Sequence, residues 1–405
     1  MAKSWIELGL MTGWPPPADK TVTLANYDQA PFQRWSFINM RELIPSALIP
    51  KSPVTKPLRR NIRDLSDFRF AHNGADHSLA DILDTTYVDA MMVIHNDEVI
   101  FEHFEQGVYP STPHIAQSVT KSFVATLAGI LIGRGEFDAS KLVTDYLPEL
   151  AGTSWDDCDL QMVLDMRTGT AFDESDYEDA DSESFRGFRI LGWLPRLADD
   201  PTPAQYIAEL KNVREHNTIF EYRSILTDVL GWCLERAAQE PLAELIAHEI
   251  WAPMGAEFDA NMLVGPLSFP MSSGGLCLSI SDLARFGLMH LHGGRVGDNQ
   301  VVPAEWVADL SNNDEALINA YKASTHAEED KPGNYYHNQW WVYDGPNQIY
   351  AGMGINGQQV YVHTPSNTVI AKFSSWPRPW IDELADFSQA GLTALCESLM
   401  NGAES

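Results

Sequence analysis

The sequence is poor in cysteine and lacks the features of a secreted or membrane protein. Residues 1–7 contain no basic segment followed by an apolar run, so we predict no signal peptide. No uninterrupted apolar run approaches the ~18 residues that a membrane-spanning helix needs. The four cysteines stand far apart without a Cys-x-x-Cys pair, which predicts buried, reduced thiols. We therefore expect a cytoplasmic protein with no membrane partner.

Basic residues are scarce relative to acidic ones. The 405 residues include 27 Lys and Arg against 56 Asp and Glu, which gives a formal net charge of −29. Such a charge repels nucleic acids and anionic membrane surfaces and argues against both as partners. Hydrophobic residues make up 44% of the chain, enough for a substantial core. A homodimer is left open.

The motifs of metal and cofactor sites are also missing. There is no His-Glu-x-x-His, and His290 and His292 lack the four-residue helical spacing that would aim both rings at one metal ion. Neither a phosphate-binding loop nor a dinucleotide fingerprint occurs. A Gly-x-Ser-x-Gly elbow is absent as well, which argues against the α/β-hydrolase fold. We expect neither a metal nor a cofactor.

Strand patterns lie at both ends of the chain, with helical patterns between them. Strands are predicted at 90–95, 99–104, 340–343, 359–362 and 369–373, and helices at 79–84, 160–166, 184–198, 203–211, 225–238, 242–252 and 381–401. Short connections between the strands favour antiparallel neighbours. The order predicts an α+β fold, an α/β sandwich in which one antiparallel sheet is built from both chain ends. Helices flank this sheet, and a mostly helical subdomain is inserted.

Three regions follow from this pattern. Residues 1–60 are rich in proline, which forbids long helices, so we expect an extended arm that its aromatic residues anchor on the body. Residues 61–115 and 265–405 are expected to form the α/β domain. Residues 116–264 are expected to form the helical subdomain.

A helix with unusual chemistry is predicted to start at Ser118. Apolar residues recur at three- and four-residue spacing until Gly133, and positions three apart are helix neighbours, so Ser118 and Lys121 lie side by side. A buried Lys amine with a lowered pKa can be the base that a serine hydroxyl needs to become a nucleophile. The helix N-terminus would favour an oxyanion near the Ser118 N–H. The alternative is a helix-capping Ser followed by a solvated Lys.

Two other segments can complete such a site. Tyr222 stands where a short extended run meets a helix, and a phenol beside a Lys amine is stabilised as phenolate and can pass protons to a leaving group. The alternative is a Tyr packed at a helix start. The glycine-rich turn 352–358 leads into a strand, where the Ile355 N–H can join that of Ser118 in an oxyanion hole. The alternative is a turn with no ligand.

Taken together, Ser118-x-x-Lys121, Tyr222-x-Ser224 and a Gly-x-Gly strand entrance resemble the motifs of the serine β-lactamase and penicillin-binding superfamily. The closer resemblance is to the 6-aminohexanoate-dimer (nylon oligomer) hydrolases and related esterases, and it spans nearly the whole chain. It is carried by the strings 11–17, 34–37, 117–123, 164–170 and 357–358. The resemblance implies that Ser118 is the acylated nucleophile, Lys121 its base and Tyr222 the proton relay. The oxyanion hole would be formed by the N–H groups of Ser118 and Ile355.

Several positions are candidates for substrate binding. Ser224 stands where a lactamase has Asn, a difference that the hydrolase group shares. Gly352 stands where the superfamily has Lys or His, which removes the cation that would hold a β-lactam carboxylate. Tyr177 resembles the loop Tyr that contacts substrate in the hydrolase group. Trp193 and Trp341 are candidate pocket walls, with a core role as the alternative.

An acidic loop follows Gly169. Seven of its residues between 173 and 183 are acidic: Asp173, Glu174, Asp176, Glu178, Asp179, Asp181 and Glu183. The resemblance implies that this loop closes over the active site. We hypothesise that one of its carboxylates receives a substrate ammonium, against the alternative of a solvated acidic face.

The sequence thus predicts a serine hydrolase that cleaves small linear amides or carboxylic esters through an acyl-enzyme. One alternative is an enzyme like a β-lactamase or DD-peptidase. Another is a binding or sensor protein that is acylated but not turned over, and a third is a structural protein with a degenerate site.

Overall fold

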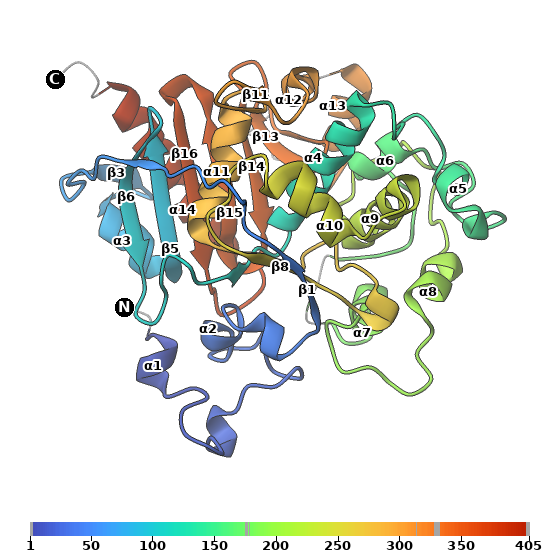
Figure 1. Cartoon of the computed structure of the whole chain (residues 1–405), viewed down its shortest axis with the longest axis horizontal. Coiled ribbons are helices and arrows are strands. Elements are labelled where there is room, and N and C mark those ends of the chain that lie inside the picture. Colours follow the sequence, from blue (N-terminus) through green and yellow to red (C-terminus); the bar gives the residue numbers. More distant parts are fainter. Residues whose placement is uncertain (1–2, 175–176, 178, 313, 328–332, 402–405) are drawn as a thin grey trace.

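The computed structural model describes residues 3–174, 177, 179–312, 314–327 and 333–401. Within these residues an eight-stranded sheet forms the centre of the molecule (Figure 1). From one edge to the other its strands are β12 (Tyr335–His337), β13 (Trp340–Asp344), β14 (Ile349–Gly354), β15 (Gln358–His363), β16 (Thr368–Ser374), β5 (Val88–His95), β6 (Glu98–Phe104) and β2 (Arg59–Arg60). All neighbours are antiparallel except β2 and β6, which are parallel. The sheet is therefore built from both ends of the chain, and the predicted α+β fold is confirmed.

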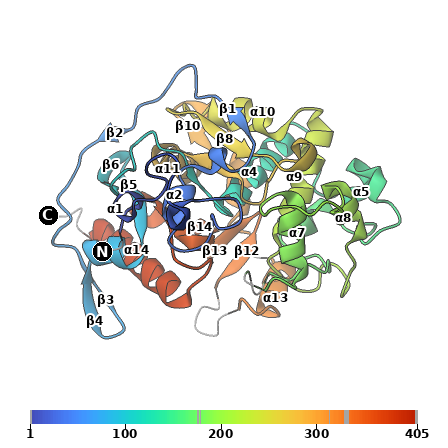
Figure 2. The same ribbon diagram turned by 90° about the horizontal axis from the view of Figure 1, so that it is seen from below.

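Helices cover both faces of this sheet. Every residue of β5 is buried, and successive side chains of a strand point to opposite faces. Met91 and Val93 pack in the cluster that includes residues of α3 and α14, whereas Met92 and Ile94 belong to the larger cluster with α11. These covering helices are α3 (Leu79–Thr85), α14 (Asp382–Asn401) and α11 (Ile280–Leu291). Figures 1 and 2 show α11 and α14 on opposite sides of the strands.

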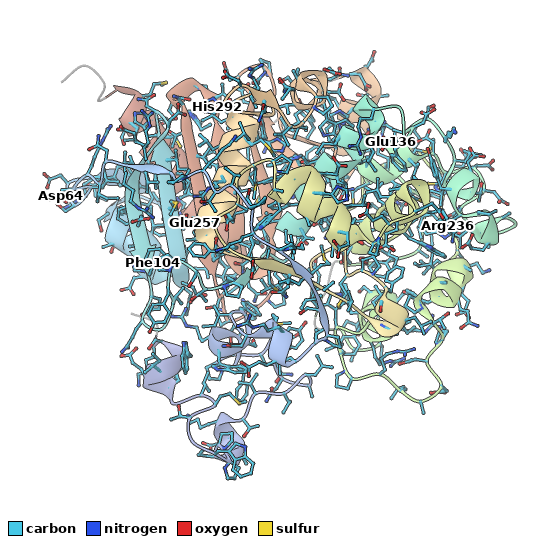
Figure 3. All side chains as sticks on the ribbon, viewed as in Figure 1. Asp64, Phe104, Glu136, Arg236, Glu257 and His292 are labelled. Carbon is cyan, nitrogen blue, oxygen red and sulfur yellow. The ribbon has the colours of Figure 1, made fainter. Side chains whose placement is uncertain are left out.

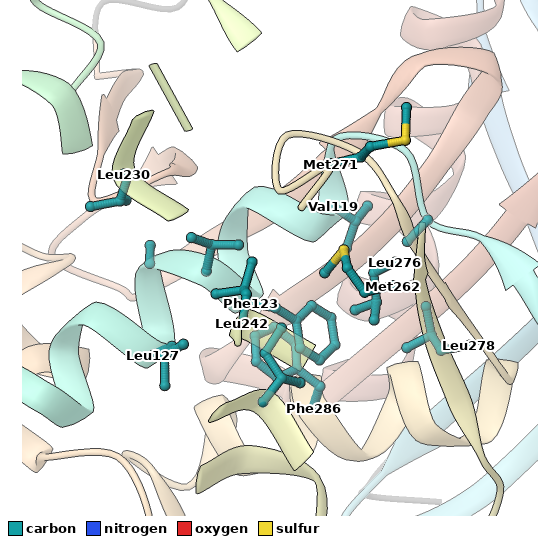
Figure 4. Packing of buried hydrophobic residues seen from close by; sticks show 14 of the residues in the cluster. Val119, Phe123, Leu127, Leu230, Leu242, Met262, Met271, Leu276, Leu278 and Phe286 are labelled. Atoms are coloured by element: carbon teal, nitrogen blue, oxygen red, sulfur yellow. The ribbon is translucent and has the colours of Figure 1, made fainter. Parts of the chain in front are cut away.

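A group of helices lies beside the sheet. Its members are α4 (Val119–Gly133), α5 (Val143–Tyr146), α6 (Leu160–Leu164), α7 (Glu183–Leu191), α8 (Pro203–Glu209), α9 (Ser224–Ala238) and α10 (Leu242–Ile246). Helix α4 joins this group to the sheet, because it contacts β14 as well as α9 and α10. Phe123 of α4 stacks on Phe286 of α11 with 3.6 Å between the ring centroids (Figure 4). The start of α4 is thus held in the middle of the core.

Charged side chains surround this core. Arg236 pairs with Glu149 at 2.6 Å, and Arg134 pairs with Glu136 and Glu249. Figure 3 shows Glu136 and Arg236 on the outside of the helical group. Exposed pairs of this kind add little stability, so buried apolar packing holds the fold together.

A second, smaller sheet was not predicted. It has the order β1 (Ser46–Ile49), β8 (Ala260–Leu263), β9 (Leu276–Leu278) and β7 (His114–Ile115). Strand β1 belongs to the proline-rich arm, whose helices α1 (Trp5–Leu8) and α2 (Gln33–Ser36) are single turns, in line with the expected lack of long helices. Arg34 of α2 forms a buried ion pair with Asp89 of β5 at 2.9 Å, which ties the arm to the main sheet.

Several boundaries differ from the prediction. The helix expected at 184–198 ends at Leu191, because Gly192 takes a left-handed conformation with φ of 102°. The helix expected at 242–252 is α10 followed by a π-turn at Ala247–Trp251. The stretch 352–354, expected as part of a turn, is the end of strand β14. The boundaries of the three predicted regions remain a prediction.

Shorter elements complete the described chain. They are β3 (Arg69–His72), β4 (Ala75–Ser78), β10 (Arg295–Val296), β11 (Asn299–Gln300), α12 (Ala304–Asp309) and α13 (Glu315–Lys322). Among the described residues, no helix combines the length and the apolar content that crossing a bilayer requires.

Candidate active site

Ser118 lies at a sharp turn between β7 and α4. Gln117, just before it, has a φ of 48°, a left-handed conformation that costs a non-glycine residue energy. Residues Val119–Leu131 of α4 are all buried, whereas Ser118 itself is only partly buried. In Figure 4, Val119 and Phe123 lie against Met262 and Leu276 of the small sheet. A rigid helix therefore presents this hydroxyl at its accessible end.

Lys121 faces Ser118 from inside the protein. Its side chain is 1% exposed, and its Nζ lies 2.8 Å from Ser118 Oγ, 3.0 Å from Ser224 Oγ and 2.7 Å from the Ser273 carbonyl oxygen. A neutral amine satisfies all three contacts, because it can donate to Ser273 and Ser224 and accept the Ser118 proton with its lone pair. The Ser118 side chain caps no helical N–H. The alternative of a capping Ser with a solvated Lys is therefore wrong.

Burial controls the charge of this amine. It lowers the pKa of Lys121 to about 8, against the opposing effect of the carboxylates of Glu174 and Asp228. An ammonium in this position would be desolvated with no ion-pair contact to either carboxylate at hydrogen-bonding distance. The site therefore holds an amine that can be neutral near physiological pH, as a general base must be.

Tyr222 lies over the same amine. Lys121 Nζ is 5.0 Å from the centroid of the Tyr222 ring, and the Ser118 side chain lies near enough to the Tyr222 hydroxyl to act on its pKa. The ring stacks on Trp341 with 5.6 Å between centroids and meets Tyr336 edge-on at 5.9 Å. Burial raises the pKa of Tyr222 well above its usual range, which favours a neutral phenol over the predicted phenolate. A neutral phenol has a proton that it can donate.

The loop that contains Met166 and Thr168 forms hydrogen bonds with the residues on either side of Tyr222. Met166 O accepts the Glu221 N–H at 2.9 Å, and Thr168 O accepts a hydrogen bond from the Arg223 guanidinium at 2.6 Å. The loop is fixed in turn by Asp165, which accepts from His337 Nδ1 at 2.7 Å and pairs with Arg167. The string 164–170, which carries part of the family resemblance, therefore positions the phenol and does not itself meet the nucleophile.

The end of β14 passes directly against the start of α4. A Cβ added to Gly354 would lie 2.9 Å from the Ser118 nitrogen and 2.8 Å from the Ala116 carbonyl oxygen, closer than real side chains come. Only glycine allows this close approach. The approach brings the backbone of Ile355 next to the N-terminus of α4, where the Ser118 N–H lies. The arrangement fits two N–H donors that converge beside the nucleophile.

The structure brings most of the candidate substrate-binding residues to this site. Ser224 bonds the amine, and Trp341 stacks on Tyr222. Burial raises the pKa of Tyr177, and the nearby Glu174 and Tyr222 raise it further; its ring stacks on Phe188. Trp193 lies beside the segment that bonds Lys121, since a Cβ on Gly274 would be 3.4 Å from its ring.

Gly352 is placed differently. It is buried, and a Cβ there would meet the Ser122 hydroxyl at 2.8 Å and Val360 at 3.2 Å. It therefore lies beneath α4 rather than beside the Ser118 hydroxyl. Asp176 and Glu178 of the acidic loop lie outside the described residues.

Sequence reasoning missed three polar groups of this site. The Ser273 carbonyl, the Asp228 carboxylate and the Glu174 carboxylate all surround Lys121, and the Ser273 N–H donates to Asp228 at 2.9 Å. In the sequence, Asp228 is only an acidic residue one turn into a helix, which does not mark it as part of a site. Glu174 is one of seven acidic residues in its loop, and nothing in the sequence distinguishes it from the other six. Within the described residues no group of three His, Cys, Asp or Glu side chains could hold a metal ion.

The fold, and the contact of a serine hydroxyl with a buried lysine amine at the start of one helix, are those expected of a serine hydrolase. The chain belongs to the beta-lactamase family, whose model matches residues 83–390. It is 32% identical over 375 residues to 6-aminohexanoate-dimer hydrolase from Paenarthrobacter ureafaciens, covering 90% of this chain and 91% of that protein. A solved structure from Bacillus anthracis, assigned as a 6-aminohexanoate-dimer hydrolase, matches with a TM-score of 0.85 and 25% identity over 95% of this chain and 99% of its own.

A more distant match shares the fold. EstCE1, a hydrolase with promiscuous acyltransferase activity, has a TM-score of 0.60 and 14% identity, covering 80% of this chain and 98% of its own. The family match and the 32% identical relative show that the protein is an enzyme, a serine hydrolase that works through an acyl-enzyme.

Proposed function

We propose that the enzyme hydrolyses small linear amides or carboxylic esters, with Ser118 as nucleophile, Lys121 as base and Tyr222 as acid. The observation that carries this proposal is the buried amine of Lys121, 2.8 Å from Ser118 Oγ, with a pKa lowered to about 8. A serine hydroxyl is a weak nucleophile without an adjacent base, and here the base is desolvated and held by two further hydrogen bonds.

Acylation follows from this geometry. Ser118 Oγ attacks the substrate carbonyl carbon while its proton passes to Lys121 Nζ. The carbonyl oxygen becomes an oxyanion beside the N–H groups of Ser118 and Ile355, which the close contact of Gly354 with the start of α4 supports. Because Tyr222 is protonated, it can donate its proton to the leaving amine or alkoxide as the C–N or C–O bond breaks. Tyr222 then regains a proton from the Lys121 ammonium.

Deacylation runs through the same groups. A water molecule takes the position of the leaving group and gives a proton to the Tyr222–Lys121 pair as it attacks the acyl carbon. The proton returns to Ser118 Oγ when the ester bond breaks. No group outside this set is needed to balance the protons.

We expect a linear substrate that needs no carboxylate anchor. Tyr177, Trp341 and Tyr336 supply aromatic surface around Tyr222. Gly352 supplies no cation, which disfavours β-lactams and cell-wall peptides. The names of the relatives point to amides of 6-aminohexanoate, whose free amine suits the acidic loop of this chain. The proposal includes a cytoplasmic location, supported by four free, buried cysteines.

Steady-state kinetics with a panel of substrates tests the proposal. We expect turnover of p-nitrophenyl esters and of linear 6-aminohexanoate oligomers, and no efficient turnover of penicillins. Ser118→Ala should lose turnover by several orders of magnitude. Ser122→Ala, one helical turn further along α4, is the matched control and should keep it. A wild-type rate in Ser118→Ala would refute the proposal, and one equivalent of product without a steady state would indicate an acylated sensor.

A further inference from the structure

The residue that follows Tyr222 carries a buried guanidinium to which the mechanism assigns no role. Arg223 is 4% exposed and stands directly before α9. Its Nη1 donates to Thr168 O at 2.6 Å, and its Nε donates to Phe172 O at 3.2 Å. Its Nη2 pairs with the Glu221 carboxylate. The side chain therefore joins two carbonyls of one loop to the segment that holds Tyr222.

The second of these carbonyls lies at the start of the acidic loop. We call residues 172–174 the loop entrance. Arg223 is the only hydrogen-bond donor to the Phe172 carbonyl within the part of the chain that the structure describes. A second contact follows two residues later, where Glu174 Oε2 accepts the backbone N–H of Ser224. The loop entrance is thus attached to the start of α9 at both of its ends.

Aromatic contacts connect the loop entrance to Tyr177. The Phe172 ring meets Phe188 of α7 edge-on with 5.9 Å between centroids, and the Tyr177 ring stacks on the same Phe188 at 6.2 Å. The packing around Phe172 is tight, since a Cβ on Gly187 would lie 2.7 Å from its ring. In a close-packed interior a displacement of one ring moves its neighbours. The position of Tyr177 therefore depends on that of the loop entrance.

A guanidinium suits this arrangement better than an ammonium does. Its N–H donors form a planar fork, so it can hold Thr168 O, Phe172 O and the Glu221 carboxylate at once, whereas a lysine offers one compact charge. Burial lowers the pKa of Arg223 to about 10, so the group stays charged near neutral pH. Arg214 pairs with the same Glu221 carboxylate and, among the described residues, bonds neither carbonyl, which makes it the matched control.

We propose that Arg223 is a positioning residue that sets substrate specificity, because it fixes the loop entrance beside Tyr222 and so holds Tyr177 at the pocket. Its backbone continues directly from the proposed acid, and its side chain holds the loop that leads to Tyr177. One residue thus sets the distance between the two phenols. Arg223 touches no reacting atom. The inference rests on the proposed function, in which Tyr177 supplies part of the aromatic surface for the substrate.

Kinetics and covalent labelling of the full-length Arg223→Lys variant test this role. The variant keeps the charge but cannot hold both carbonyls, so KM for linear 6-aminohexanoate dimer should rise by about 10-fold or more, with a much smaller change in kcat. The rate at which a small fluorophosphonate labels Ser118 should stay within about threefold of the wild type, since the contact of Ser118 with Lys121 is untouched. Arg214→Lys should change neither quantity.

The Ser224 N–H reports on the loop entrance without any substrate. The first N–H groups of a helix have no partner within it, and this one donates to Glu174. Residue-resolved hydrogen exchange should therefore be faster at Ser224 by about 10-fold or more in Arg223→Lys. Exchange at the Val213 N–H, which donates to Gly169 O, should stay unchanged.

Phe188→Leu interrupts the contact from the other side and provides the test should Arg223→Lys fail to fold. Phe188 is half-buried, and the variant should raise KM for the dimer while exchange at Ser224 stays at the wild-type rate.

Three results would overturn the role of Arg223. They are a wild-type KM for the dimer in Arg223→Lys, an unchanged exchange rate at Ser224, and a labelling rate that falls as far as turnover does, which would indicate a merely structural residue. The proposed function fails separately, since it requires labelling of Ser118 in the wild type. Wild-type labelling with no effect of Arg223→Lys would refute this inference alone.

Discussion

A single methyl group at Gly354 should disable the oxyanion hole. In Gly354→Ala the new Cβ would lie 2.8 Å from the Ala116 carbonyl oxygen, and 2.9 Å from both the Gln117 Cβ and the Ser118 nitrogen. Two of these three contacts are backbone atoms, so the strand end must retreat from α4 by a sizeable fraction of an ångström. The Ile355 N–H moves with it and loses its hydrogen bond to the developing oxyanion.

The size of the effect follows from the role of this donor. Removal of one oxyanion-hole donor typically lowers kcat by about 10²–10³, or about 3–4 kcal/mol of transition-state stabilisation. Because the bond is made mainly in the transition state, kcat should fall with little change in KM. Stopped-flow kinetics with a p-nitrophenyl ester measures both.

Gly352→Ala is the matched control on the same strand. Its Cβ would meet the rotatable Ser122 hydroxyl at 2.8 Å and the methyl groups of Val360 and Val119 at 3.2 and 3.4 Å, away from the Ser118 nitrogen. It should lower the melting temperature and leave kcat within a few-fold of the wild type. A wild-type kcat in Gly354→Ala, or an equal loss in both variants, would refute the oxyanion assignment.

Three further predictions follow from the site and its supports. Tyr222→Phe should lower kcat for amides by about 10²–10⁴ and for p-nitrophenyl esters much less, because p-nitrophenolate leaves without a proton; equal losses would count against its role as acid. Asp228→Asn removes a carboxylate that raises the pKa of Lys121, so the acid limb of kcat/KM should move to lower pH, and a shift to higher pH would contradict the electrostatics. Asp165 and Asp309 raise the pKa of His337 from 6.5 to about 10 in the folded protein. A group whose pKa is raised on folding stabilises the fold most at pH values below its pKa in the unfolded chain. The stability difference between wild type and His337→Gln should therefore be largest below pH 6.5 and shrink by about 3–5 kcal/mol as the pH rises through 10; a difference constant with pH in urea unfolding would argue against it.

Structural features that depend on residues close together in the chain could be predicted from sequence patterns. The three-residue spacing of Ser118 and Lys121 predicted their contact, and alternating runs around a polar turn predicted the β5–β6 hairpin. The fold class followed because strand patterns stand at both ends of the chain. The pairing of Tyr222 with these residues depended on the resemblance, since nothing local links positions a hundred residues apart.

The missed features have physical causes. Strand β14 ends in Gly352-Met353-Gly354, and glycine weakens a strand pattern because it has no side chain to pack. The strands of the small sheet have two to four residues, too few to show a period. Glu174 comes near Lys121 only because its loop folds back onto the start of α9, where its carboxylate accepts the Ser224 N–H. Burial, which shifts the pKa of both groups, cannot be read from the sequence.

The central claim is that Lys121 activates Ser118, and covalent labelling tests it most directly. Intact-mass analysis with a fluorophosphonate should show one adduct per chain, mapped by peptide sequencing to Ser118. Lys121→Ala should slow the labelling rate by at least about 10²-fold, since the hydroxyl loses its base. An adduct on another residue, or an unchanged labelling rate in Lys121→Ala, would contradict the account.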